Sequence, residues 1–197
     1  IQKMKNNDLK KLLTDIYKSN KKTLQRIPAS IAMHYPYRSG YLEHILSMAK
    51  VGMKLARHYQ ADEDLLLAGT LLHSVGKVRE FTDALIPEYT DEGNFLGHTN
   101  IGRDMAREAA AKINDFPPDL LLKLEHMISS HEGVFDGRRA SRAKTKEALL
   151  LQLIDHMDTR LNVYDKVILQ DNQHGEWTSR RNFFGTALYK GKSTADS

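Results

Sequence analysis

The chain contains no cysteine among its 197 residues. Disulfide bonds, thiolate metal ligands and thiol-based redox chemistry are therefore excluded. No apolar run reaches the 18 or so residues that a helix needs to span a bilayer. The N-terminal residues also lack the apolar core of a signal peptide. We therefore expect a cytoplasmic protein with no membrane partner.

A strong charge of one sign is also missing, because 29 Lys and Arg residues face 25 Asp and Glu residues and leave a formal net charge of +4. The excess basic residues gather in three segments, 3–26, 138–146 and 180–192. Such clusters suit phosphate-bearing partners, although solvated helix faces have the same composition. The length is sufficient for one domain with a sizeable core.

Helical periodicity dominates the sequence, and few segments alternate as strands do. These features predict an all-α fold, in which residues 82–97 form a loop. The last helix is expected to present Leu150, Leu153, Met157 and Leu161 to the core. The predicted helices cover about residues 5–25, 41–59, 62–73, 98–113, 118–131 and 143–169.

The predicted domain organisation has three parts. Residues 1–35 form an N-terminal helix and a lead-in segment, and residues 36–190 form the helical domain. Residues 191–197 are expected to be a disordered tail.

Histidine is abundant where cysteine is absent: the chain has nine. Imidazole is the commonest metal ligand. A histidine on an apolar helix face is also often a hydrogen-bonded core residue, and periodicity alone places Asp155 equally well on a solvated face. His126 and His131 lie about 140° apart around one helix, so both reach one metal only with help from the helix end. The candidate ligands lie at predicted helix ends or within apolar helices: His44, His73, His98, His126, His131 and Asp155.

The order of these motifs is more specific than their spacing. Leu71-Leu72-His73-Ser74-Val75-Gly76-Lys77 is followed by His126-Met-Ile-Ser-Ser-His131 and by Ile154-Asp155-His-Met-Asp158. Over about residues 8–190 this order resembles the HD-domain metal-dependent phosphohydrolases, and among them the catalytic domain of the YhaM-type 3′→5′ exoribonucleases. The resemblance implies an HD-domain helical bundle that hydrolyses single-stranded RNA or DNA from the 3′ end.

The resemblance also implies roles for particular residues. It makes all six candidate ligands metal ligands, and it assigns the catalytic work to His73, Ser74, Lys77 and Asp155. Ligands without sulfur suit Mn²⁺ first, and also Fe²⁺, Co²⁺, Ni²⁺ or Zn²⁺, as one or two ions. The metal would activate a water molecule that attacks phosphorus. The expected substrate-binding residues are Lys77, Arg38, Arg138 and Arg139.

Ser74 departs from the family pattern, because the second residue of the defining pair is an aspartate that bridges two metals. A serine hydroxyl is neutral and a poor ligand, so both metal sites should be weakened. Three explanations stay open: an engineered inactivating change, natural degeneration to a binding or scaffold role, or retained activity with one metal or with compensation by Asp155. Tyr35 and Glu132 also replace histidines of the pattern, and Glu132 keeps a group that coordinates metals.

Three functions therefore remain in consideration. The first is an impaired 3′→5′ exonuclease, and the second is a weak binding module that holds RNA or a nucleotide through Lys77 and residues 138–146. The third is an HD-type nucleotidase. The sequence begins without Met, and the resemblance implies an oligonucleotide/oligosaccharide-binding barrel before this domain in a longer protein. A homo-oligomer is a further expectation.

Overall fold

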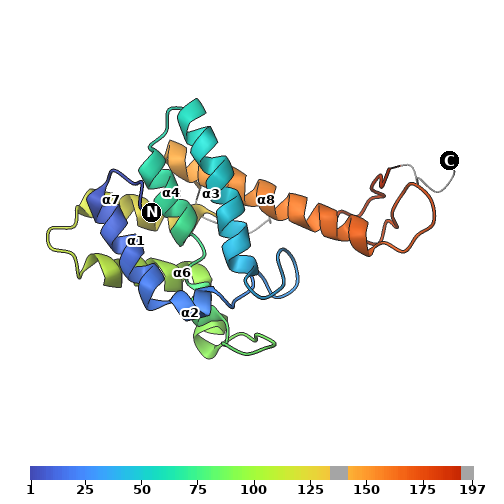
Figure 1. The fold of residues 1–197 in the computed structure, drawn as a ribbon, viewed down its shortest axis with the longest axis horizontal. Coiled ribbons are helices and arrows are strands. Elements are labelled where there is room, and N and C mark those ends of the chain that lie inside the picture. The colour runs from blue at the N-terminus through green and yellow to red at the C-terminus, as the bar shows by residue number, and fades with distance from the viewer. Residues whose placement is uncertain (134–141, 192–197) are drawn as a thin grey trace.

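The computed structural model describes residues 1–133 and 142–191, and within them the chain is helical with no strand (Figure 1). The described residues form two isolated antiparallel β-bridges, one between Phe81 and Tyr89 and one between Trp177 and Tyr189. The prediction of an all-α fold is confirmed. The helices are α1 (Asn7–Ser19), α2 (Lys21–Leu24), α3 (Gly40–His58), α4 (Glu63–Leu72), α5 (Lys77–Glu80), α6 (Asp91–Ala110), α7 (Pro118–Ser130) and α8 (Lys146–Gln170).

Side-chain caps fix where several helices begin. Asn6, Asp62 and Thr145 each accept a hydrogen bond from a backbone N–H in the first turn of the helix that follows. Thr90 does the same for α6, so residues from Asp91 onward are helical where a loop was predicted. A kink at Gly97, with φ at 69°, then redirects α6 just before His98.

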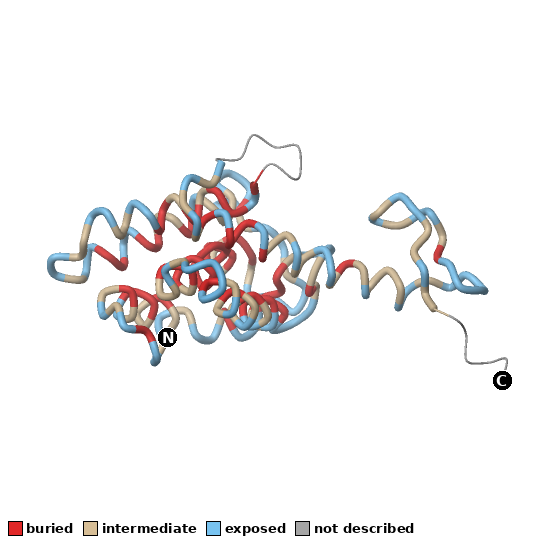
Figure 2. The backbone as a smooth tube through the Cα atoms, turned by 90° about the horizontal axis from the view of Figure 1, so that it is seen from above, coloured by how far each residue is buried: buried red, intermediate tan, exposed pale blue. Residues whose placement is uncertain are grey.

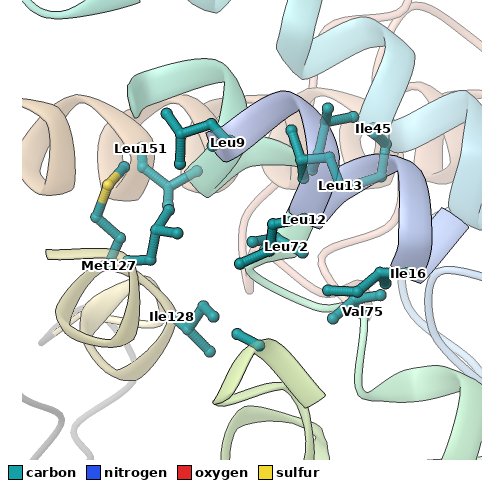
Figure 3. Close-up of a cluster of buried hydrophobic side chains, with 14 of the residues drawn as sticks. Leu9, Leu12, Leu13, Ile16, Ile45, Leu72, Val75, Met127, Ile128 and Leu151 are labelled. Atoms are coloured by element: carbon teal, nitrogen blue, oxygen red, sulfur yellow. The ribbon is translucent and has the colours of Figure 1, made fainter. Parts of the chain in front are cut away.

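Helix α4 lies at the centre of the bundle and packs against α1, α3, α7 and α8. It is buried nearly all round because its sequence is apolar on every side. Figure 3 shows Leu72 of this helix among side chains of α1 and α7. The C-terminal end of α4 therefore opens inside the bundle, and the polar segment 73–77 is held there.

Helix α8 is only partly a core helix. Leu150 and Ile154 are buried, but Leu153, Met157 and Leu161 are 40–58% exposed, so the predicted core face is wrong for these three residues. The reason is that α3, α4 and α7 pack on the side that carries Leu150 and Ile154. Beyond this contact α8 extends away from the body and carries the segment that follows it (Figures 1 and 2).

None of the described helices combines the length and the apolar character needed to cross a bilayer. Two predictions concern residues outside the described ranges. Arg138 and Arg139 belong to segment 134–141, and most of the predicted tail belongs to segment 192–197.

Gly76 sets the distance between the segment after α4 and helix α6. A Cβ atom at this position would lie 2.1 Å from the carbonyl oxygen of His98 and 2.6 Å from the backbone nitrogen of Gly102. Both atoms belong to the backbone, so they cannot move aside as the tip of a flexible side chain does. Only glycine therefore allows the turn after His73 to pack this closely against the backbone of α6 at His98 and Gly102.

We expect Gly76→Ala to destabilise the protein by about 2 kcal/mol, because overpacking against backbone forces α6 away. Thermal unfolding measures this loss. Gly52→Ala, within α3, is the matched control. Its new Cβ atom would lie 3.5 Å from Ile154 Cδ1, which is an ordinary van der Waals distance. Equal melting temperatures for the two variants would contradict the packing argument.

Candidate metal centre

His44, His73 and Asp155 form the first group of potential ligands. Their ligand atoms lie within 4.8 Å of one another. His44 Nε2 lies 3.2 Å from Asp155 Oδ1, and His73 Nε2 lies 4.0 Å from the same oxygen. Both histidines are 1% exposed. The three residues come from α3, the end of α4 and α8, so only the folded bundle brings them together.

His98, His131 and Glu132 form the second group, with ligand atoms again within 4.8 Å of one another. His98 Nε2 lies 3.4 Å from His131 Nε2 and 3.6 Å from Glu132 Oε1. His131 is buried and caps the end of α7, while Glu132 follows it and is more exposed. This group is therefore the more open of the two.

The two groups are continuous. The ring centroids of His44 and His73 are 5.7 Å apart, those of His73 and His131 are 4.9 Å apart, and those of His131 and His98 are 5.4 Å apart. A fifth ring, that of His34, lies 4.9 Å from His44. The arrangement is a row of imidazoles through the interior of the bundle, with three ligands at each end.

Each imidazole of the four-ring row has a partner for its Nδ1 atom. His44 Nδ1 lies 2.8 Å from Asp158 Oδ2 and His98 Nδ1 lies 3.3 Å from Glu80 Oε1. His73 Nδ1 and His131 Nδ1 lie 2.9 and 2.7 Å from the carbonyl oxygens of Thr70 and Ile128. All four partners are acceptors, so Nδ1 carries the proton in each neutral ring and the Nε2 lone pair is left to bind a metal ion. At His44 the Asp155 carboxylate faces Nε2, and Asp155 and Asp158 raise the pKa of the ring against the effect of burial, so a metal ion there would displace a proton.

These free lone pairs fit a bound metal ion. His44 Nε2 is buried and meets Asp155 Oδ1 at 3.2 Å, but it forms no regular hydrogen bond with the described residues, and such a buried polar atom costs stability unless something binds it. The Nε2 atoms of His98 and His131 face each other as two acceptors. A divalent cation satisfies both arrangements, since neutral imidazole and carboxylate are common ligands of transition metals.

Burial and charge together set the protonation of the centre. Burial lowers the pKa of His73 and brings that of His131 to about 4, so both rings are neutral at physiological pH. Burial alone would raise the pKa of Asp155, but the His44 imidazole, 3.2 Å from its carboxylate, and the neighbouring histidines hold it well below its usual range. Neutral His73 and His131 and the ionised Asp155 are therefore in the forms that coordinate metals.

The family model of the HD domain matches residues 41–160. The chain belongs to the HD domain family. It is 32% identical over 192 residues to the 3′-5′ exoribonuclease YhaM of Shouchella clausii, covering 94% of this chain and 60% of that protein. It is also 32% identical over 197 residues to YhaM of Bacillus subtilis, covering 96% of this chain and 62% of that protein.

The resemblance to HD-domain phosphohydrolases and YhaM-type exoribonucleases is thereby confirmed. The chain spans 60% and 62% of the length of these two curated relatives. No solved structure gives a significant match to the chain.

The structure gathers five of the six predicted metal ligands and leaves His126 apart. His126 Nε2 accepts a hydrogen bond from the backbone N–H of Lys144 at 2.8 Å, and it belongs to neither ligand group in the described part of the chain. Because His131 lies at the end of α7, its ring turns inward where His126, on the helix body, does not. Glu132 completes the second group in place of a histidine.

The residues predicted to contact substrate lie in different environments. Lys77 is buried, and its ammonium donates to the carbonyl of Ala29. Burial lowers the pKa of Lys77, while the charges of Asp155, Glu80 and Glu132 act in the opposite direction. Arg38 is exposed, in the segment before α3.

Ser74 follows His73 in the turn between α4 and α5 and is 1% exposed. Its Oγ lies near the buried Tyr41 hydroxyl and forms no regular hydrogen bond with the described residues. The HD pattern has a carboxylate at this position, and the chain places a small neutral side chain there.

Two carboxylates that support the ligands were not predicted from the sequence. Asp158 accepts from His44 and from the Ser47 hydroxyl. Glu80 pairs with both the backbone N–H and the ring of His98, and these hydrogen bonds lower its pKa against the effect of burial. Their spacing in the sequence could have indicated them. Asp158 lies three residues after Asp155, and Glu80 lies three residues after Lys77, which is about one helical turn in each case.

We expect Asp158→Asn to weaken divalent-metal binding roughly 10–100-fold, as loss of the acceptor that orients a ligating histidine does. Calorimetric titration with Mn²⁺ measures the affinity. Asp165→Asn is the control, because Asp165 is an exposed residue of the same helix outside both ligand groups. An affinity unchanged in Asp158→Asn would show that His44 needs no such support.

The metal-free protein should lose stability as pH falls from 6.5 towards 4. Burial lowers the pKa of His131 to about 4 and that of His34 to about 3, so the unfolded chain binds more protons than the folded chain in this window. His131 alone contributes on the order of 3 kcal/mol, while His44, whose pKa is raised, acts in the opposite sense.

Thermal unfolding in the presence of a chelator tests this expectation. His131→Gln should flatten the dependence of melting temperature on pH, because it removes one of the titrating rings. Identical slopes for the parent chain and the variant would contradict the assignment.

Proposed function

We propose that this chain is the catalytic domain of a metal-dependent phosphodiesterase that degrades single-stranded RNA or DNA from the 3′ end, with activity impaired by Ser74. The main observation that supports this proposal is the row of imidazoles, whose Nε2 atoms are available to a metal and which has a ligand group at each end. The names of the relatives, 3′-5′ exoribonucleases, support the substrate class. The second ligand group, the more exposed of the two, is the proposed side of substrate approach.

The residues present fit a divalent ion, for which we propose Mn²⁺. His44, His73 and Asp155 would hold one ion, and His98, His131 and Glu132 would hold a second. Such an ion, when bound, lowers the pKa of water and stabilises negative charge on phosphoryl oxygens. The chain's own part is to keep Nδ1 protonated and Nε2 free, and to keep Asp155 ionised in a site that excludes bulk water.

The impairment follows from charge. The first group brings one carboxylate and the second group brings one, so two divalent ions would share two negative charges before substrate binds. An aspartate at position 74 would add a third, at the junction of His73 with the turn to α5. Without it the repulsion between two cations is less balanced.

A binding role without turnover is the second candidate function. It is favoured by one observation, the buried and neutral Ser74 side chain next to His73. A site that holds a phosphate-bearing ligand through its remaining metal ligands needs no bridging carboxylate.

Ser74→Asp tests both candidates. We expect the variant to bind more metal per chain and to shorten a labelled single-stranded RNA from its 3′ end at least about 100 times faster than the parent, in line with the worth of a charge placed at a reacting centre. Metal analysis and product gels measure the two effects.

Ser74→Asn is the matched control, because it has the shape of aspartate without the charge. Increased metal content without hydrolysis in Ser74→Asp would favour the binding role. No metal in any of the three proteins would contradict both candidates.

A further inference from the structure

A pocket of about 380 Å³ lies between the segment before α3 and the loop that precedes α6. One wall is formed by residues of segment 26–38 and the other by residues 83–87. The first wall contributes two arginines, an aromatic ring and an aliphatic side chain, and the second contributes two aliphatic side chains. The residues that matter for its chemistry are Arg26, Ile31, Tyr37, Arg38, Leu85 and Ile86.

The two walls are tied together. Arg26 and Asp83 form an ion pair at 3.0 Å across the pocket. The second wall is the tip of a small hairpin, closed by the bridge between Phe81 and Tyr89 and by the packing of their rings at 5.2 Å. The hairpin therefore has a defined base under an exposed tip.

Leu85 and Ile86 occupy that tip, and they are 91% and 79% exposed. Ile31 and Tyr37 on the opposite wall are also exposed, at 40% and 46%. Adjacent exposed apolar residues on both walls of one pocket mark a binding site more often than isolated ones do.

The pocket is connected to the metal centre. The Tyr35 ring lies 5.5 Å from the His44 ring and 6.1 Å from the Tyr37 ring. The hydrogen bond from Lys77 to the carbonyl of Ala29 attaches the same segment to the turn that carries His73. The first wall of the pocket therefore packs, through Tyr35, against the residues of the metal centre.

The charges of the pocket favour an anionic chain with flat apolar groups. Asp83 is already neutralised by Arg26, whereas the Arg38 guanidinium forms no ion pair with the described residues. An exposed tyrosine ring accepts the face of any base, and a free arginine beside it contacts a phosphate. An apolar peptide would leave the Arg38 charge unused.

We propose that this pocket binds one nucleotide of the single-stranded nucleic acid whose end lies at the metal centre. The base stacks on Tyr37 against Leu85 and Ile86, and Arg38 contacts the adjoining phosphate. This inference rests on the proposed function and adds to it a second contact point that recognises an unpaired base.

Equilibrium binding of a short, labelled, single-stranded RNA tests the pocket. We expect Tyr37→Ala to weaken binding roughly 5- to 100-fold, the worth of one base–aromatic stack. Tyr37→Phe should retain most of the affinity, because it keeps the ring and loses only the hydroxyl that donates to Glu43. Tyr59→Ala is the control, since Tyr59 is similarly exposed but lies at the other end of α3.

Arg38→Ala should reduce the slope of log affinity against log salt by about one, because one phosphate contact is lost. A fully paired RNA duplex should compete poorly with the single strand, because its bases cannot enter the pocket. Equal affinities of Tyr37→Ala and Tyr59→Ala would overturn the proposal, and so would the absence of RNA binding by the parent chain.

Metal content separates this proposal from the proposed function. The pocket variants should bind as much Mn²⁺ as the parent chain, since none of them alters a ligand. If the parent binds no metal while Tyr37→Ala still loses RNA, the phosphodiesterase proposal fails and the pocket proposal stands. If the parent binds metal and Ser74→Asp hydrolyses RNA while Tyr37→Ala binds RNA normally, the pocket proposal fails and the phosphodiesterase proposal stands.

Discussion

The hydrogen bonds made by Nδ1 in four buried imidazoles are the constraint on which the rest of the site depends. Each ring donates to an acceptor behind it, two to carboxylates and two to backbone carbonyls one turn earlier. The acceptors fix the tautomer and turn every Nε2 toward the interior. The bundle builds this arrangement. Helix α4 is apolar on all sides, so His73 at its end lies in the centre, and Gly76 lets α6, which carries His98, pack against the turn after α4.

Ser74 places a small neutral side chain beside His73 in the interior of the bundle. With serine at this position, the ligand atoms within each group lie no more than 4.8 Å from one another. A fold can therefore preserve metal ligands while the charge that balances two cations is missing. The proposed Tyr37 pocket is compatible with either proposed role, because none of its lining residues belongs to a ligand group.

The sequence predicted the all-α fold and five of the residues that gather in the centre, because buried helices and the order of the HD motifs are local or sequential features. It could not place His126, whose ring direction depends on α7 continuing past it. It missed Asp158 and Glu80 because a supporting carboxylate looks like any surface acid until its partner is known. It assigned Leu153, Met157 and Leu161 to the core because periodicity reports an apolar face and not which neighbours cover it. Contacts between residues more than a hundred positions apart, such as His44 with Asp158, exist only in the folded chain.

A crystal structure of the Mn²⁺-loaded chain with anomalous scattering measured at the manganese edge tests the central claim most directly. The account predicts an anomalous peak coordinated by the Nε2 atoms of His44 and His73 with Asp155, and a second position, if filled, at His98, His131 and Glu132. A peak bound through Nδ1, a peak at His126, or no peak at either ligand group would contradict it.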